Sequence, residues 1–281
     1  MRLAAGGVAL LLCGTTAQAQ SLRGFSTFRQ MHGETRLTAQ LEYAAGNLEV
    51  SPGRPGELYR MDLSYDEDRF VPVSDFDAAS GEVVLGLRSR GESGVRVSSR
   101  NQLLQVAKVA ISPRVDLALA LNLGAAEAQI ELGGLRVSSL DLKTGASKAV
   151  ISFSRPNATR CRQAVFSAGA AEVTVLGLGN SRCDEIEFEA GVGSVTLDFG
   201  GTWSSSARVA VNMAVGGLTL RLPRQVGVRI AMDKFLSSFE PAGLVRRGDA
   251  FVSENYDRAT RRLDLEITTA VGGVGVQWLD E

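Results

Sequence analysis

One short pattern returns along most of this chain, and it constrains the fold more than any other feature. A small residue that follows an apolar-x-apolar pair recurs at Ala44, Gly124, Gly145, Gly169, Gly191, Ala214 and Ala270. We call these the corner residues. The four consecutive spacings from Gly124 to Ala214 are 21, 24, 22 and 23 residues. A period near twenty is typical of folds in which each unit buries its apolar side on the next.

Apolar residues occupy fixed positions around every corner residue. Three positions before the corners stand Leu41, Leu121, Leu142, Phe166, Phe188, Val211 and Ile267. The residues four and six positions after each corner are also apolar, as with Val173 and Val175 after Gly169. Alternation on both sides of the corner is the period of half-buried strands. Each unit is therefore predicted to be strand, tight corner, strand, with glycine allowing close backbone approach.

We therefore predict an all-β chain that folds as a single-stranded β-solenoid-like stack with 21–24 residues per coil. One coil per repeat would place equivalent side chains one strand spacing apart, about 4.8 Å. Leu142, Phe166 and Phe188 should then be neighbours in one ladder. An antiparallel sandwich also has short strands at regular spacing. It does not, however, require the same side-chain chemistry at matched positions.

The period is interrupted twice, and the interruptions suggest how the chain is divided. Strand-like stretches fall between Ala44 and Gly124, at 61–70 and 81–90. We assign residues 20–115 to an irregular N-terminal β part of the domain, and residues 116–281 to the repetitive part.

The second interruption predicts an insertion at 223–262, within which 231–239 is the best candidate for a short helix. The ends of such a stack must be covered, because open strand edges promote aggregation. We expect residues 52–115 to cover one end or flank and residues 223–262 to shield the other.

Residues 1–19 are predicted to be a cleavable signal peptide. They contain Arg2, an apolar run to Leu12 and a small-residue site that ends at Ala19, after which cleavage is expected. The run is far shorter than the roughly 20 residues of a transmembrane helix. Lipid attachment at Cys13 is not expected, because Leu12 stands where lipoprotein signals have a small residue. We therefore expect a periplasmic or secreted protein that does not span the membrane after cleavage.

The charge balance excludes one class of partner. Removal of the signal peptide leaves 29 basic and 31 acidic residues. Binding of nucleic acid needs a clustered basic face, which so even a balance does not predict. We expect no nucleic-acid partner.

The cysteines of the mature chain stand at matched positions. Cys161 and Cys183 are 22 residues apart, and each lies eight residues before its corner residue. Neighbouring coils would supply the Cα separation of about 4.4–6.8 Å that a disulfide needs, and an exported chain meets an oxidising environment. We predict a disulfide. Two unpaired cysteines remain an alternative, whereas a metal pair lacks further ligands.

Residues for common catalytic chemistry are scarce. His32 is the only histidine and lies near the mature N-terminus, so a Ser-His-Asp or Cys-His arrangement is not expected. The glycines lack the context of a phosphate-binding loop. We predict a protein without enzymatic activity and without a cofactor.

Two further motifs have functional interpretations. Carboxylates that could ligate Ca²⁺ cluster at Asp62, Asp66, Glu67 and Asp68. A solvated turn is the commoner explanation for such a cluster. Asn157-Ala158-Thr159 fits a glycosylation sequon.

The segment 240–262 is the most function-like loop. Tyr256 stands there among Arg246, Arg247, Arg258, Arg261 and Arg262. Because loops on a rigid scaffold often carry binding sites, an anionic partner such as a cell-wall polymer or lipid head group is one interpretation. The alternative is a solvated hairpin whose charge is balanced by Asp249, Glu254 and Asp257.

Several segments in one order carry a family resemblance. They are RLTAQLEYAAGNLEVSPG, LYRMDLSYDEDRFVPVSDFD, ISPRVDLALALNLGAAEAQIELGGLRVSSLDLKTGAS and NYDRATRRLDLEITTAVGGVGVQW. From about Leu37 to Trp278 the chain resembles the toast-rack family of bacterial exported proteins. Those modules are similar to the extracellular domain of cell-wall-antibiotic response proteins and to adhesin-like domains. The resemblance implies a β-solenoid-like stack with no established catalytic residues. The chain departs from membrane-anchored members by its predicted cleavable signal.

These observations lead to one main functional hypothesis and two rivals. The main one is a non-enzymatic envelope protein, an interaction, scaffold or adhesin-like module that binds an envelope protein or a cell-wall or surface glycan. A polysaccharide-acting enzyme or a carbohydrate-binding β-helix protein is the alternative, with Glu187 and Glu189 or Asp184 and Asp198 as candidate acids. Such an enzyme needs two carboxylates about 5–9.5 Å apart. The third hypothesis is a sensor of envelope stress that acts through a membrane protein.

Overall fold

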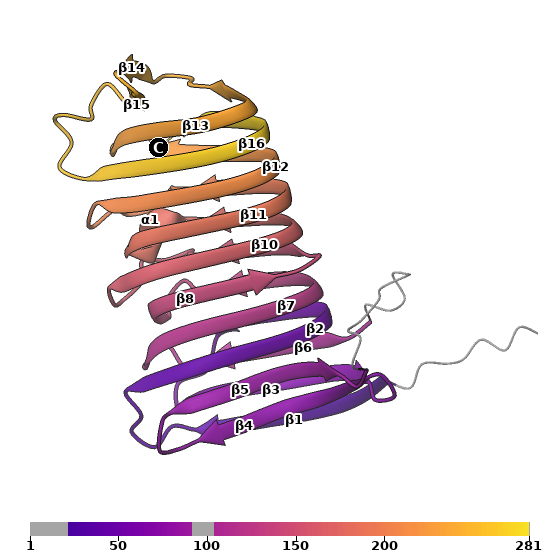
Figure 1. The fold of residues 1–281 in the computed structure, drawn as a ribbon. Helices are drawn as coiled ribbons and strands as arrows, with labels where there is room; N and C mark the ends of the chain where they lie inside the picture. Colours follow the sequence, from indigo (N-terminus) through magenta and orange to yellow (C-terminus); the bar gives the residue numbers. More distant parts are fainter. Residues whose placement is uncertain (1–21, 92–103, 281) are drawn as a thin grey trace, which may run out of the picture.

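The computed structural model describes residues 22–91 and 104–280, which fold into one parallel stack of bent strands (Figure 1). The first half of the stack contains β1 (Leu22–Gln30), β2 (Arg36–Pro52), β3 (Glu57–Asp66), β4 (Phe70–Asp77), β5 (Glu82–Ser89), β6 (Val106–Ile111), β7 (Asp116–Glu131), β8 (Arg136–Thr144) and β9 (Lys148–Ser152). The second half contains β10 (Cys161–Leu176), α1 (Leu178–Ser181), β11 (Cys183–Asp198), β12 (Ala207–Pro223), β13 (Gly227–Glu240), β14 (Val245–Arg247), β15 (Ala250–Val252) and β16 (Arg262–Leu279). The predicted all-β class is confirmed.

Pairing between coils follows the spacing of the sequence repeat. Leu142 opposes Phe166 and Phe166 opposes Phe188, both in parallel register. The rings of Phe166 and Phe188 stack with their centroids 5.6 Å apart. The predicted ladder of inward side chains is therefore confirmed. Its members are almost completely buried, and this burial of apolar surface stabilises the stack.

At the position two residues after several of the corner residues, the backbone conformation and the space available allow only glycine. Gly193, Gly216 and Gly272 have φ angles of 149°, 138° and 138°. A Cβ atom on any of them would overlap a carbonyl oxygen of the preceding coil, as that of Gly216 would overlap Gly193. The coils approach so closely at the bend that a side chain there would separate them. The repeating glycines are therefore a requirement of the stacking.

Both ends of the stack are interleaved, which the sequence repeat did not indicate. At the C-terminal end β16 lies between β12 and β13, parallel to both. At the N-terminal end β2 lies between β7 and a coil formed by β5 and β6 (Figure 1). β2 and β16 therefore each pair with other strands on both sides along most of their length.

Antiparallel pairs occur at both ends of the stack: β13, β15 and β14 form them at the C-terminal end, and a larger set lies at the N-terminal end. β3 pairs with β6 and β1 pairs with β3, whereas β4 pairs with β5. Part of the segment 20–115, namely β2, β5 and β6, thus continues the parallel stack. The boundary at residue 115 stays a prediction, as does the signal peptide at 1–19, which with Cys13 lies outside the described residues. Within the described residues no helix is long and apolar enough to cross a membrane.

The short helix expected at 231–239 is wrong. These residues belong to β13, where Met232 opposes Ile267 and Leu236 opposes Val271. Apolar residues at 232, 235, 236 and 239 suit a helical period as well, but pairing with β16 decides the conformation. Because Lys234 opposes Thr269 and Leu236 opposes Val271, Phe235 is level with the corner residue Ala270. The segment 223–262 therefore contributes a further coil to the stack. β15 pairs with the start of β13, and Phe251 packs edge-on against Phe239 at 5.0 Å.

The predicted disulfide joins adjacent coils. Cys161 opposes Cys183 in the β10–β11 pair, with an S–S distance of 2.00 Å and Cα atoms 4.1 Å apart. Both cysteines are buried. The covalent bond thus reinforces a parallel pairing that the repeat already specifies.

We predict that Gly216→Ala lowers the free energy of unfolding by about 2 kcal/mol or more, because the new Cβ meets backbone and the φ angle disfavours any side chain. Gly217→Ala is the matched control, since a Cβ there has no atom within 4 Å. Denaturant unfolding of both variants measures the difference. Equal stability of the two variants would contradict the steric argument.

We also predict that the double variant Cys161→Ser with Cys183→Ser loses about 3 kcal/mol of unfolding free energy, since the bridge no longer restricts the unfolded chain. Wild-type protein that is unfolded, reduced and then refolded without the disulfide should lose a similar amount of unfolding free energy. An unchanged denaturation midpoint in the variant would show that the pairing of β10 and β11 alone suffices.

Candidate functional site

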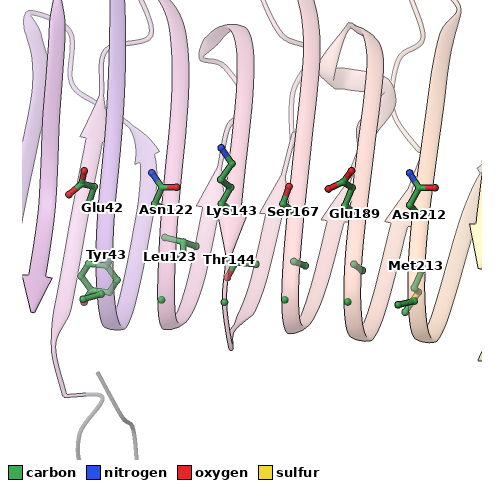
Figure 2. A pocket seen from close by; sticks show the side chains of 18 of the residues that line it. Glu42, Tyr43, Asn122, Leu123, Lys143, Thr144, Ser167, Glu189, Asn212 and Met213 are labelled. Atoms are coloured by element: carbon green, nitrogen blue, oxygen red, sulfur yellow. The ribbon is translucent and has the colours of Figure 1, made fainter. Parts of the chain in front are cut away.

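A long open groove follows the corners of the stack, across the direction of the strands (Figure 2). Its volume is about 1170 Å³, and it extends from β5 to β16. The corner residues Ala44, Gly124, Gly145, Gly169, Gly191, Ala214 and Ala270 all line it. We call it the corner groove. Because these residues carry no side chain or a single methyl group, the groove exposes backbone and small apolar surface.

One edge of the groove carries a row of polar side chains. The residues two positions before the corners are Glu42, Asn122, Lys143, Ser167, Glu189, Asn212 and Thr268. We call them the polar row, and Figure 2 shows most of them side by side on successive coils. The residues between the row and the corners, such as Tyr43 and Met213, are buried. In-register parallel pairing repeats the row at the strand spacing of about 4.8 Å.

Charges in the row are partly neutralised by close partners. Glu42 accepts hydrogen bonds from Arg88 and, at 2.8 Å, from Gln40. The bond from Arg88 is the main reason why the pKa of Glu42 is lowered, although partial burial opposes it. Lys143 forms an ion pair with Asp141 at 3.0 Å. The remaining members of the row are amides and hydroxyls apart from Glu189.

The acids considered for polysaccharide cleavage are not gathered in this groove. Glu189 lines it, whereas Glu187 accepts a hydrogen bond from Gln163 at 2.9 Å and lines a smaller depression. Asp184, at the start of β11, accepts from Arg160 at 2.8 Å. Asp198, at the end of the same strand, accepts from the backbone of Gly200 at 2.8 Å.

The arginine-rich segment lies at the C-terminal end of the stack, outside the corner groove. Arg247 pairs with Asp257 at 2.9 Å, as the balanced-hairpin interpretation expects. Arg262 lies over the Tyr256 ring at 5.2 Å, and the Tyr256 hydroxyl donates to Asp264 at 2.7 Å. These contacts hold the segment together.

The other three arginines of that segment are exposed, namely Arg246, Arg258 and Arg261. Of them, Arg246 donates to the backbone of Gly248 within its own hairpin. An anion-binding role for this loop stays a prediction.

Three of the four carboxylates proposed for Ca²⁺, namely Asp62, Asp66 and Glu67, have separate protein partners. Glu67 pairs with Arg23 at 2.5 Å, and Asp62 accepts from the Ser26 hydroxyl at 2.5 Å. Asp66 is buried and accepts from the backbone of Asp68 at 3.1 Å. Across residues 22–91 and 104–280, no group of three or more acidic, histidine or cysteine side chains could hold a metal ion.

The structure contradicts the glycosylation sequon at Asn157. Its side chain is buried, and Nδ2 donates to the carbonyls of Val137 (2.7 Å) and Ser181 (3.0 Å). Oδ1 accepts from the backbone of Val137 at 3.0 Å. The amide therefore bridges neighbouring coils and is inaccessible to a glycan-transferring enzyme.

The sequence contained a signal for the corner groove that motif reasoning missed. In every aligned repeat the residue two positions before the corner is polar. This column can be recognised only when the repeats are stacked, because its members are about twenty residues apart. Its meaning as the edge of a groove depends on the bend in each strand.

Comparisons with known proteins give a family and several similar folds. The family described as the N-terminal domain of toast_rack, DUF2154, matches residues 17–176. No curated protein matches the chain. A candidate cell adhesion protein from Clostridium sporogenes is similar in structure at 17% identity and a TM-score of 0.48, over 92% of this chain and 100% of that one. A candidate adhesin from Bacteroides fragilis has 12% identity and a TM-score of 0.43, over 92% and 99%.

We predict that Arg88→Gln raises the pKa of Glu42 toward its ordinary value. A carboxylate whose folded pKa is lowered adds stability above its unfolded pKa of about 4.3, and this is lost as pH falls through the folded value. The stability difference between wild type and variant should therefore be present at neutral pH and vanish in acid. Carboxyl NMR titration and denaturation from pH 2 to 7 measure both effects.

The control for this prediction is Lys108→Gln. Lys108 pairs with Glu49 at 3.3 Å, but both side chains are more than half exposed. Because water screens this exposed pair, Lys108→Gln should change the free energy of unfolding less than Arg88→Gln does. An equal pH dependence in the two variants would contradict a specific role for the Arg88–Glu42 pair.

Proposed function

This chain belongs to the toast-rack family, and on that premise we propose that it is a non-enzymatic, adhesin-like module of the cell envelope that binds a surface glycan. We place the binding site in the corner groove. The observation that carries the proposal is one continuous groove over successive coils, with a polar row at one edge. We also class the stack as a single-stranded β-solenoid, because the register of Cys161 with Cys183 equals one repeat of 22 residues.

The shape of the groove favours a linear partner. It crosses the coils of β2, β7, β8, β10, β11, β12 and β16, and at about 4.8 Å per strand this corresponds to roughly 30 Å. An extended polymer that lies along the stack could therefore contact the same groups once per coil. A compact small molecule would use only a short part of the groove.

The chemistry of the polar row favours a partner rich in hydroxyl groups. Asn122, Ser167 and Asn212 project from every second coil, on β7, β10 and β12, and offer donors and acceptors together. The small corner residues leave space for a sugar ring to approach the backbone. Because Arg88 neutralises Glu42, and Asp141 neutralises Lys143, the groove suits a neutral glycan better than a highly charged one.

Absence of catalysis remains part of the proposal. It is supported by the position of His32, which is exposed on the connection after β1 and bonds to the Gln30 carbonyl at 3.0 Å. It is also supported by the ion pair that engages Glu42, one of the two groove acids in the polar row. A glycosidase would instead need a raised pKa on one acid of a pair.

The cellular setting follows from the same premise. The disulfide between Cys161 and Cys183 suits an oxidising compartment, which supports export to the periplasm or beyond the cell. A link to the envelope stress response would make the groove a sensor of glycan state. Transcription of neighbouring genes after cell-wall antibiotic treatment would test that link.

We predict that Ser167→Trp, in the middle of the polar row, weakens binding of polysaccharide purified from the producing organism's own envelope by tenfold or more, because the indole blocks the groove. Thr196→Trp on β11 is the control, since Thr196 lies beyond the corner and does not line the groove. Calorimetry measures affinity, and chromatography of the polymer measures cleavage. Equal affinity in both variants would show that the corner groove is not the binding site. A shortened polymer would contradict the proposal that the protein is not an enzyme.

A further inference from the structure

The last strand of the stack leaves much of one edge unpaired. β13 pairs with β16 on its inner side, and on its outer side β15 pairs only with Arg229, Ile230 and Ala231. No other described strand pairs with the outer edge from Met232 to Glu240. β13 stands at the end of the stack, beside the short hairpin of β14 and β15 (Figure 1). Its outward backbone groups therefore offer a template for another strand.

Large apolar side chains stand at the centre of this open edge. Phe235 is 81% exposed and Leu236 is 66% exposed. Phe235 is level with Ala270, at a position where the other coils have glycine or alanine. The apolar interior at this end is covered without these two side chains, because Phe251 packs on Phe239 and Ile230 is buried. Exposed apolar residues beside an unpaired edge indicate an interface.

The opposite end of the stack is protected in ways that β13 lacks. β4 carries Pro72, which has no backbone N–H to donate to another strand. Arg29 of β1 packs 4.0 Å over the ring of Phe76, and Ser74 donates to Thr27 at 3.2 Å. These contacts bring the outer strands β1 and β4 together. In contrast, the free part of β13 contains no proline.

We propose that the outer edge of β13 pairs antiparallel with the same edge of a second copy of this chain, about a two-fold axis through the corner. Phe235 of each copy then lies opposite Leu236 of the other. Along the edge, Lys234 faces Ser237, Asp233 faces Ser238 and Met232 faces Phe239 of the second copy. The inference is independent of the proposed glycan-binding function.

This register preserves the inside and the outside of both stacks. Met232 and Phe239 oppose the buried Ile267 and Val274 of β16, so both occupy inward positions. Asp233 and Ser238 oppose Thr268 and Gly273, and both are exposed. Because the strand changes sides at the bend, a register centred on the bend, between Phe235 and Leu236, pairs inward with inward and outward with outward positions.

The length and charge of the edge are also self-complementary. Before the bend, the free edge begins at residue 232, directly after the residues that pair with β15, and it contains four residues, 232–235. The segment of the second copy that faces it, 236–239, also has four residues. No two like charges face each other in this register. A two-fold interface is closed, so it yields a dimer and removes the open edge instead of propagating a fibre.

The first test is the mass of the full chain, expressed with its predicted signal peptide and purified after export. Light scattering and sedimentation should give a dimer at micromolar concentration. Leu236→Lys should weaken dimerisation about tenfold or more, because it removes buried apolar surface and places two cations in the interface. Val192→Lys is the control, since Val192 is also exposed (55%) but lies on β11 within the stack. Both variants should keep the wild-type thermal transition at high dilution.

The second test reads the register directly. An equimolar mixture of Asp233→Cys chains and Ser238→Cys chains should form interchain disulfides on mild oxidation, because these positions face each other. Either variant alone should cross-link far less, since its own cysteines would be several residues out of register. Mixing Asp233→Cys with Glu240→Cys gives a mismatched control. The native Cys161–Cys183 bond is buried and should remain intact.

A monomer at all concentrations up to about 100 µM would overturn the proposal, since a specific interface of ordinary size binds more tightly than that. So would a dimer that Leu236→Lys leaves unchanged, or cross-linking equal in matched and mismatched mixtures. Either result would mean that another surface, or none, joins the copies.

Discussion

The close approach of one coil to the next at a sharp bend is the constraint on which the rest of this structure depends. Parallel strands must keep their hydrogen-bond spacing while the chain turns, so the backbone of each corner lies against the carbonyl of the coil before it. Gly193, Gly216 and Gly272 meet that requirement in successive coils of the stack. Once it is met, the inward ladders, the disulfide and the outward rows all follow at the same spacing.

The same constraint creates the candidate site. Small corner residues allow the coils to stack, and for the same reason they leave a groove where larger side chains would project. The polar row beside it is then repeated by the register, so that Asn122, Ser167 and Asn212 form a regular array. In this protein the surface proposed to bind a polymer is thus a by-product of the packing rule that holds the stack together.

The ends depart from this regularity. At each end one strand is inserted between others: β16, the last in sequence, lies between β12 and β13, and β2 lies between β7 and the coil of β5 and β6. Aromatic and cationic contacts close the N-terminal end around Phe76. The C-terminal end instead leaves Phe235 and Leu236 at an unpaired edge. This asymmetry is why an interface is expected at one end only.

The sequence by itself determined the repeat, the inward ladder through Phe166 and Phe188, and the pairing of Cys161 with Cys183, because each depends on residues one period apart. Only the tertiary structure decided that β16 and β2 insert between other coils, since a strand of matching pattern can pair with either neighbour. It likewise decided that 231–239 is a strand and that Asn157 is buried, because burial and pairing with β16 and with the coils beside Val137 override local propensity and motif. The corner groove arose from the bend itself, which no short motif records.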